Sequence, residues 1–207
     1  ENVLFLLKYN VKLIIIACNT SSAIGLPFLS KYFSVPIIGV IKPGAKAAVR
    51  STRNGRVGVI GTTATISSKA YGKEIKALDP KIRVYSKDCP LFVPLVEEGW
   101  AGDGIVDVAA RKYLLPLKEN KIDTLILGCT HYPLLKASVQ RIMGKAVRLV
   151  DSAEETAKEA KDLLEERRLK YPGKRSGRLK FYVSDAPGKF LMVAKRFLGK
   201  DVKTAEQ

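Results

Sequence analysis

Residues 125–133 read Leu-Ile-Leu-Gly-Cys-Thr-His-Tyr-Pro, an apolar run followed by a small residue, a cysteine and a polar cluster. Residues 13–22 repeat this order as Leu-Ile-Ile-Ile-Ala-Cys-Asn-Thr-Ser-Ser. Each apolar run is typical of a strand buried on both faces, and each polar cluster is typical of the start of a helix. The two stretches form a weak internal repeat, which predicts two similar sheets that face each other across a cleft.

The rest of the chain continues this alternation of strands and helices. Strands are predicted at residues 11–17, 35–41, 57–61, 82–86, 124–128, 147–150 and 179–183. Helices are predicted at residues 21–33 (interrupted near Pro27), 65–78, 103–117, 133–143 and 187–198. Ser152 and Glu155 predict a capping box for a further helix that runs towards Arg168. The pattern predicts an α/β fold of two similar domains, with mainly parallel sheets flanked by helices and the active site in the cleft between them.

The composition is that of a globular protein. Apolar residues make up 46% of the 207 residues, and no apolar run approaches the ~20 residues that span a bilayer. Three cysteines offer no disulfide framework, and no secretory pattern is visible, so we expect a cytoplasmic location and no membrane partner. His131 is the only histidine, which excludes a metal site built from several histidines, and we expect no metal.

The formal net charge of +16 is unusual. Basic residues crowd one stretch, namely Arg167, Arg168, Lys170, Lys174, Arg175, Arg178 and Lys180. This stretch could attract nucleic acid, or it could be a solvated helix end followed by a basic loop. No nucleic-acid recognition motif accompanies the charge, so we favour the solvated interpretation and expect no nucleic-acid partner. A basic surface would still help to steer an anionic small substrate.

Cys18 and Cys129 occupy matching positions, each after a predicted strand and before a predicted helix. Backbone N–H groups at a helix start bind anions and lower the pKa of a thiol placed there. To invert a stereocentre, a base must act on one face of the carbon and an acid on the other, and two thiols can fill both roles. A free cysteine is also often a small buried hydrophobe, and we interpret Cys89 in that way. The matched pair favours proton transfer over packing.

At these residues the sequence resembles glutamate racemase, the cofactor-independent enzyme that supplies D-glutamate for bacterial peptidoglycan. The matching segments are Ala-Cys-Asn-Thr-Ser at residues 17–21 and Gly-Cys-Thr-His-Tyr-Pro-Leu-Leu at residues 128–135. The second segment is highly specific, because it separates this family from the related aspartate and hydantoin racemases. Further agreement at residues 58–65, 94–99, 150–152 and 181–199 extends the resemblance over nearly the whole chain.

The resemblance implies that L- and D-glutamate are interconverted by two-thiol proton transfer at the α-carbon, without a cofactor. Carried over by position, Cys18 and Cys129 are the catalytic acid/bases, and His131 assists Cys129. The substrate-binding positions are Asn19, Thr20, Thr62, Thr65, Thr130 and His131. Glu97 matches a carboxylate near the cleft and is a candidate acid/base assistant, although it could equally be a surface carboxylate at a helix end.

The resemblance also implies a domain organisation. Residues 1–41 together with 151–207 would form the first α/β domain, and residues 42–150 would form the second. The implied partner is the small molecule glutamate, and a homodimer is left open.

The start of the chain departs from the family pattern. The family begins with a strand that carries an Asp-Ser-Gly motif, followed by a Tyr-Gly substrate-binding segment, and neither precedes Cys18. The Asp is the expected partner of the first thiol, so we interpret the chain as a family member that lacks its N-terminal strands. Two alternatives stay open: a catalytically impaired remnant that binds carboxylates or nucleic acid, and a racemase for a related amino acid such as aspartate.

Overall fold

The computed structural model describes residues 1–174, 176–199 and 202–206, so Arg175 of the basic stretch lies outside the described residues. The chain divides into two compact units, Glu1–Lys170 and Tyr171–Gln207. The first unit contains every residue predicted to belong to the site. The division into domains 1–41 with 151–207 and 42–150 stays a prediction.

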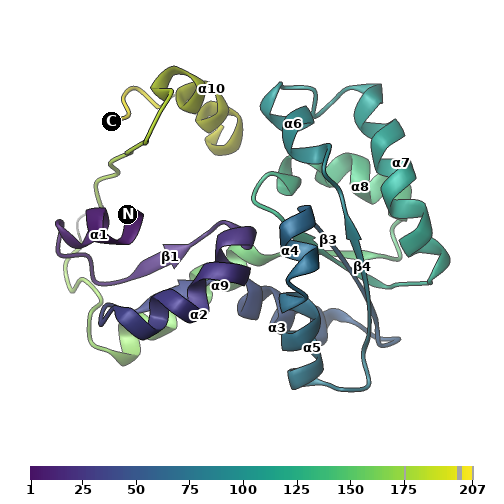
Figure 1. Ribbon diagram of the computed structural model, residues 1–207, viewed down its shortest axis with the longest axis horizontal. Coiled ribbons are helices and arrows are strands. Elements are labelled where there is room, and N and C mark those ends of the chain that lie inside the picture. The colour runs from purple at the N-terminus through teal and green to yellow at the C-terminus, as the bar shows by residue number, and fades with distance from the viewer. Residues whose placement is uncertain (175, 200–201, 207) are drawn as a thin grey trace. The chain divides into compact units, whose positions relative to one another are not determined.

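The first unit is built on two parallel sheets (Figure 1). In the smaller sheet, β1 (Ile14–Ile16) pairs with β2 (Ile37–Gly39). The larger sheet has the order β4 (Arg83–Asp88), β3 (Arg56–Gly61), β5 (Thr124–Gly128) and β6 (Arg148–Asp151). Each neighbouring pair is parallel, and helices connect the strands. This arrangement confirms the predicted α/β class with parallel sheets flanked by helices.

Helices cover both faces of the larger sheet, which explains the continuous apolar runs in its central strands β3 and β5. Leu125 and Leu127 of β5 pack in one core with α6 (Phe92–Glu97), α7 (Gly104–Glu119) and α8 (Lys136–Met143). Ile126, between them, packs in a second core with α3 (Ile41–Ser51) and α5 (Ala70–Leu78). Successive side chains of a strand point to opposite faces, so β5 contributes to both cores.

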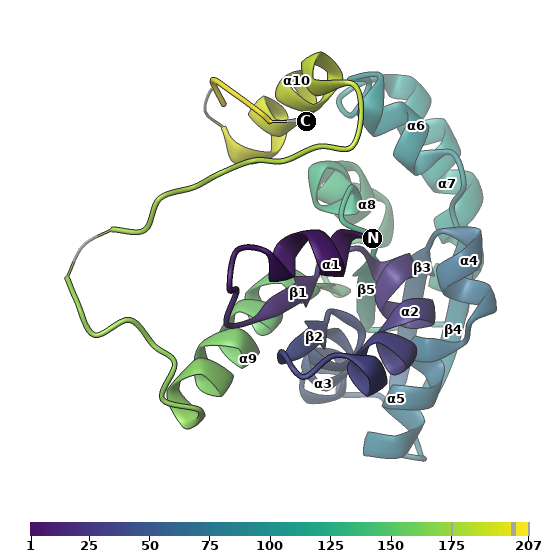
Figure 2. The same ribbon diagram turned by 60° about the vertical axis from the view of Figure 1, so that its left-hand side comes forward.

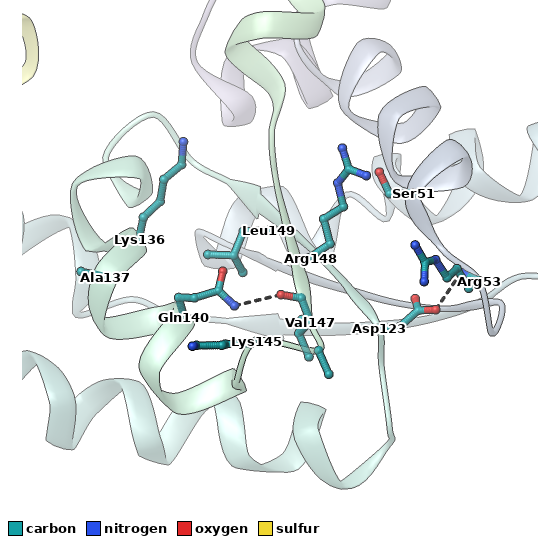
Figure 3. Close-up of a pocket in the computed structure, with 11 residues that line it drawn as sticks. Ser51, Arg53, Asp123, Lys136, Ala137, Gln140, Lys145, Val147, Arg148 and Leu149 are labelled. Atoms are coloured by element: carbon teal, nitrogen blue, oxygen red, sulfur yellow. Dashed lines mark hydrogen bonds between the residues drawn. The ribbon is translucent and has the colours of Figure 1, made fainter.

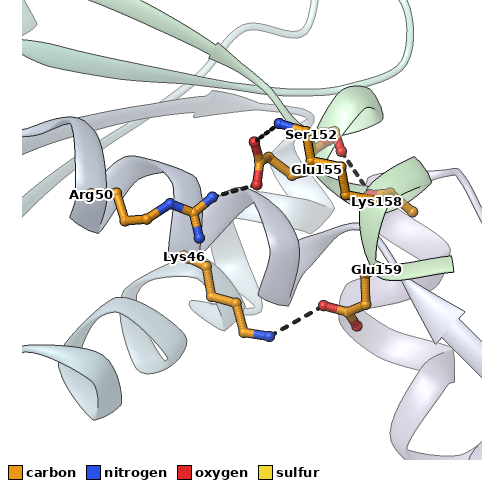
Figure 4. A network of polar contacts seen from close by, with 7 residues as sticks. Lys46, Arg50, Ser152, Glu155, Lys158 and Glu159 are labelled. Carbon is orange, nitrogen blue, oxygen red and sulfur yellow. Dashed lines mark hydrogen bonds and ion pairs between the residues drawn. The ribbon is translucent and has the colours of Figure 1, made fainter. Parts of the chain in front are cut away.

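The smaller sheet is covered by α2 (Asn19–Tyr32), which packs against β1 and β2 (Figure 2). The first unit also contains α1 (Asn2–Leu7), α4 (Thr63–Ser67), the 3-10 helix η1 (Tyr132–Leu135) and α9 (Ser152–Glu166). α9 packs against α3, and two ion pairs join them: Lys46 with Glu159 at 3.3 Å and Arg50 with Glu155 (Figure 4). The basic side chains of both pairs are exposed, so we expect each pair to contribute about 1 kcal/mol or less.

The second unit contains α10 (Pro187–Leu198), which confirms the helix predicted at residues 187–198. The strand predicted at residues 179–183 is wrong. Its ladder contact among the described residues is one isolated bridge between Tyr182 and Glu206. An extended segment becomes a strand only when a second segment forms hydrogen bonds with its backbone along its length, and a single bridge is too short for this.

One predicted helix interruption is wrong, and two helices were not predicted. The helix predicted at residues 21–33 runs through Pro27 without a break, at the expense of one backbone hydrogen bond. The strand predicted at residues 35–41 ends at Gly39, and the unpredicted α3 follows with Pro43 in its first turn, where the missing N–H is tolerated. The unpredicted α6 likewise contains Pro94 in its first turn.

Two further helix predictions need correction. The single helix predicted at residues 65–78 is split into α4 and α5, because Lys69 adopts a left-handed conformation with φ 56°. The predicted capping box of Ser152 and Glu155 is wrong. Asp151 caps α9 instead, since its Oδ1 accepts a hydrogen bond from the N–H of Ala153 at 3.0 Å. The positive end of the helix dipole also stabilises a carboxylate at this position.

Among the described helices, none combines the length and the apolar character that crossing a bilayer requires.

Candidate active site

The predicted site residues meet at the carboxyl ends of the parallel strands. Cys18 follows β1, Thr62 follows β3 and Cys129 follows β5. β3 and β5 are in register, with Gly61 opposite Gly128, so Thr62 and Cys129 begin neighbouring loops. Ligands of α/β folds bind at this edge of the sheet, which is where the sequence predicts the chemistry.

Three threonine hydroxyls join the two sheets. Thr20 of α2 lies 2.8 Å from Thr62 and 3.0 Å from Thr65, and the hydroxyls of Thr62 and Thr65 are 3.0 Å apart. Thr62 also caps α4, because its Oγ1 accepts a hydrogen bond from the N–H of Thr65. The start of α2 is therefore tied to the start of α4, and three of the predicted binding residues form one hydroxyl cluster.

Asn19 is held by a residue that the sequence analysis missed. The Asn19 side chain is only 3% exposed, and its Oδ1 accepts a hydrogen bond from the Tyr71 hydroxyl at 2.6 Å. Burial raises the pKa of Tyr71, so its hydroxyl stays protonated and remains a donor. The only signal in the sequence was that Tyr71 lies four residues before Ile75 on one apolar face of a helix, which indicates no more than a core residue.

Tyr71 also touches the other half of the site. A Cβ atom placed on Gly128, the residue before Cys129, would lie 3.2 Å from Cε2 of Tyr71 and 2.5 Å from the carbonyl oxygen of Ile60. Glycine is therefore required at residue 128, because the aromatic ring and the neighbouring strand leave no space for a side chain. Tyr71 thus contacts the residues next to both cysteines.

Cys129 lies at one end of a chain of acid and base groups. Its Sγ is 3.9 Å from Nδ1 of His131, and the Thr130 hydroxyl is 3.3 Å from the same nitrogen. On the other side of the ring, Nε2 of His131 lies 3.4 Å from Oε1 of Glu97, the last residue of α6. The order carboxylate, imidazole, thiol allows the imidazole to exchange a proton with the thiol while the carboxylate orients the ring.

Burial raises the pKa of the Cys129 thiol, and the charge of Cys18 raises it further. The N–H groups of His131 and Tyr132 and the hydroxyl of Thr130 act in the opposite direction but do not compensate. This corrects the prediction that a helix start lowers the pKa of this thiol. The side chain is only 7% exposed and packs in the apolar core, so desolvation of the thiolate outweighs the amide hydrogen bonds.

The other two cysteines differ sharply in exposure. Cys18 is exposed and precedes the first residue of α2, with its carbonyl accepting a hydrogen bond from the N–H of Ser22. Cys89 is completely buried in the core beside Phe92, which agrees with its interpretation as a packing residue. The predicted site residues thus form two groups. The first contains Cys18, Asn19, Thr20, Thr62 and Thr65, and the second contains Cys129, Thr130, His131 and Glu97.

Comparison with known proteins assigns the class. Residues 4–160 match the sequence model of the Asp/Glu/Hydantoin racemase family. The chain belongs to this family, and similar proteins at 45–49% identity are glutamate racemases, which are isomerases.

Three similar proteins illustrate the relationship. Glutamate racemase from Geobacter metallireducens is 49% identical over 195 residues, which are 94% of this chain and 72% of that protein. The crystal structure of a glutamate racemase isoform from Bacillus anthracis has a TM-score of 0.94 at 38% identity, covering 99% of this chain and 76% of that chain. The crystal structure of glutamate racemase from Francisella tularensis in complex with D-glutamate has a TM-score of 0.90 at 39% identity, covering 98% of this chain and 75% of that chain.

Proposed function

We propose that the chain interconverts L- and D-glutamate by moving the α-proton between the two thiols Cys18 and Cys129. The observation that carries the proposal is the placement of both thiols at strand ends of the two sheets, where the charge of one raises the pKa of the other. One thiolate takes the α-proton, so a C–H bond breaks and an S–H bond forms. On the opposite face the second thiol gives its proton to the carbanion, and the reverse reaction exchanges the roles.

The surroundings of each thiol suit this exchange. Cys129, whose pKa is raised, rests as a protonated acid near neutral pH, and His131 with Glu97 can take up its proton when a base is needed. Asn19 uses its Oδ1 for Tyr71 and keeps its amide N–H groups as donors for a substrate carboxylate. The hydroxyls of Thr20, Thr62 and Thr65 add further polar groups at the same strand ends. The proposal includes no metal and no cofactor.

Glutamate is the proposed substrate because the similar proteins are named glutamate racemases and one of them was crystallised with D-glutamate. The D-glutamate formed would supply peptidoglycan synthesis in the cytoplasm. Aspartate is the closest competing substrate.

The test is the exchange of the α-proton in D2O. The wild-type chain is expected to place deuterium at the α-carbon of L-glutamate while D-glutamate accumulates, and to do so faster than with L-aspartate. Cys18→Ala and Cys129→Ala should each abolish racemisation, because one of the two faces then has no acid or base. Each single variant keeps one thiol and should still exchange the proton of one enantiomer, and the two variants should act on opposite enantiomers.

Cys89→Ala is the matched control, since it removes a thiol that lies outside the site, and it should retain exchange. Exchange that survives in the double variant Cys18→Ala/Cys129→Ala would contradict the thiol mechanism. Calorimetry that detects glutamate binding to the folded wild-type chain, without any exchange, would contradict the proposed activity and favour a binding protein.

A further inference from the structure

A basic groove lies along β6, an edge strand of the larger sheet. It has a volume of about 860 Å³, and four cations line it: Arg53, Lys136, Lys145 and Arg148 (Figure 3). Arg148 pairs with Thr124 at the start of β5, whereas Cys129 follows the end of that strand. At ~3.3 Å per residue, five residues separate the Arg148 end of the groove from Cys129 by roughly 16 Å along the sheet. The groove shares no residue with the proposed active site.

The charge of the groove is only partly neutralised in the described part of the chain. Lys136 pairs with Asp151 at 2.8 Å, but in the described part of the chain no carboxylate forms an ion pair with Arg53, Lys145 or Arg148. All three of these side chains belong to exposed residues. Three cations at one groove repel one another, and a bound anion would remove this repulsion.

Asp123 is the one acidic residue among those that line the groove, and its oxygens are already occupied. Oδ1 accepts hydrogen bonds from the hydroxyls of Thr52 and Thr124, and Oδ2 accepts from the N–H groups of Arg53 and Asn54. Although partial burial acts to raise it, these hydrogen bonds hold the pKa of Asp123 below its usual value. The carboxylate therefore organises the loop after α3 and does not compete with a ligand for the basic side chains.

The N–H of Arg148 bonds to the carbonyl of Asp123 on the β5 side, so strand alternation turns both the N–H and the C=O of Leu149 to the unpaired edge. The carbonyl group of Val147, which would repel an anion, accepts a hydrogen bond from Nε2 of Gln140 at 2.9 Å (Figure 3). The carbonyl group of Gly144 accepts one from the same nitrogen at 2.8 Å.

We propose that this groove binds a small anion that carries phosphate groups. Two arginines offer planar forks that match phosphate oxygens, and the two lysines add point charges. The volume falls in the range of ordinary small-molecule sites and exceeds what a single phosphate needs, so the ligand carries more than one phosphate or a phosphate on a larger body. The site is independent of the proposed racemase activity.

The test measures binding to the full chain by calorimetry, with inorganic tripolyphosphate and with ADP as separate probes at a moderate, fixed salt concentration. Saturable binding of either probe is expected. Binding of tripolyphosphate alone would identify an inorganic polyphosphate-type ligand, and tighter binding of ADP would identify a nucleotide-type ligand. The variant Lys145→Gln/Arg148→Gln removes two of the unpaired cations and should weaken binding at least tenfold.

The control is Arg111→Gln/Lys112→Gln, which removes the same two charges from exposed positions on α7 and should change the affinity less than twofold. Circular dichroism checks that both variants fold. The proposal would be overturned if neither probe binds the wild-type chain, or if both variants weaken binding equally, since the effect would then come from the net charge of +16 alone. Binding of a duplex oligonucleotide with the same residue dependence, in the absence of small-probe binding, would also overturn it.

Discussion

Replacing Tyr71 with phenylalanine removes one hydroxyl and leaves the aromatic ring in place between the two halves of the site. The ring keeps its contacts with Gly44 and Gly128, so the packing is preserved. The loss is the 2.6 Å hydrogen bond to Oδ1 of Asn19. Asn19 is 3% exposed, so water has little access to that oxygen in the folded variant.

An acceptor left unsatisfied in the protein interior costs about 1–3 kcal/mol. We therefore expect Tyr71→Phe to lower the free energy of unfolding by about 2 kcal/mol and the melting temperature by roughly 5 °C. The same change frees the Asn19 amide to rotate, so the KM for glutamate should rise. Urea denaturation followed by circular dichroism measures the first effect, and initial racemisation rates measure the second.

Tyr113→Phe is the matched control. Within the described residues the Tyr113 hydroxyl has no hydrogen-bond partner, while its ring packs against Phe92, so this variant should change stability by less than about 0.5 kcal/mol. A double-mutant cycle with Asn19→Ala should give a coupling of about 1 kcal/mol or more between Tyr71 and Asn19. A Tyr71→Phe variant as stable as the wild type, with zero coupling, would refute the reasoning.

Three other predictions concern the strand ends. Iodoacetamide, with mass spectrometry as the readout, should alkylate the exposed Cys18 before Cys129. Because burial raises the pKa of Cys129, its alkylation should appear only above pH about 8.5, the usual thiol pKa. Half-maximal modification of Cys129 below that pH would contradict this prediction. Thr62→Val should cost about 1 kcal/mol in urea denaturation through loss of the α4 cap, whereas an unchanged midpoint would show that the cap contributes nothing. Gly128→Ala should lower the free energy of unfolding by about 3 kcal/mol. Gly72→Ala, in α5, should not destabilise the chain, because Gly72 has open space around it. Equal effects of the two variants would contradict the close contact of Gly128 with Ile60 and Tyr71.

Local sequence accounted well for the central strands β3 and β5 of the larger sheet, because a strand buried on both faces needs a continuous apolar run. The run at residues 124–128 was predicted with the bounds that β5 has in the structure. Local sequence failed at Pro27, which was predicted to interrupt a helix but lies within the unbroken α2, and it did not indicate α3 or α6. It also failed at residues 179–183, where strand formation depends on a partner that local sequence does not reveal.

For the site, the sequence by itself determined which residues stand at the strand ends, because cysteine, threonine and asparagine directly follow the apolar runs. Glu97 was a candidate through resemblance alone, and only the packing of α6 showed that it lies 3.4 Å from His131. Only the tertiary structure decided the direction of the Cys129 pKa, since desolvation depends on neighbours from distant parts of the chain. The same holds for Tyr71 and Asn19, which are 52 residues apart and meet because the fold brings the start of α2 to the start of α5. Local periodicity assigns a residue to a buried face, but the partner that it meets there is decided by the fold.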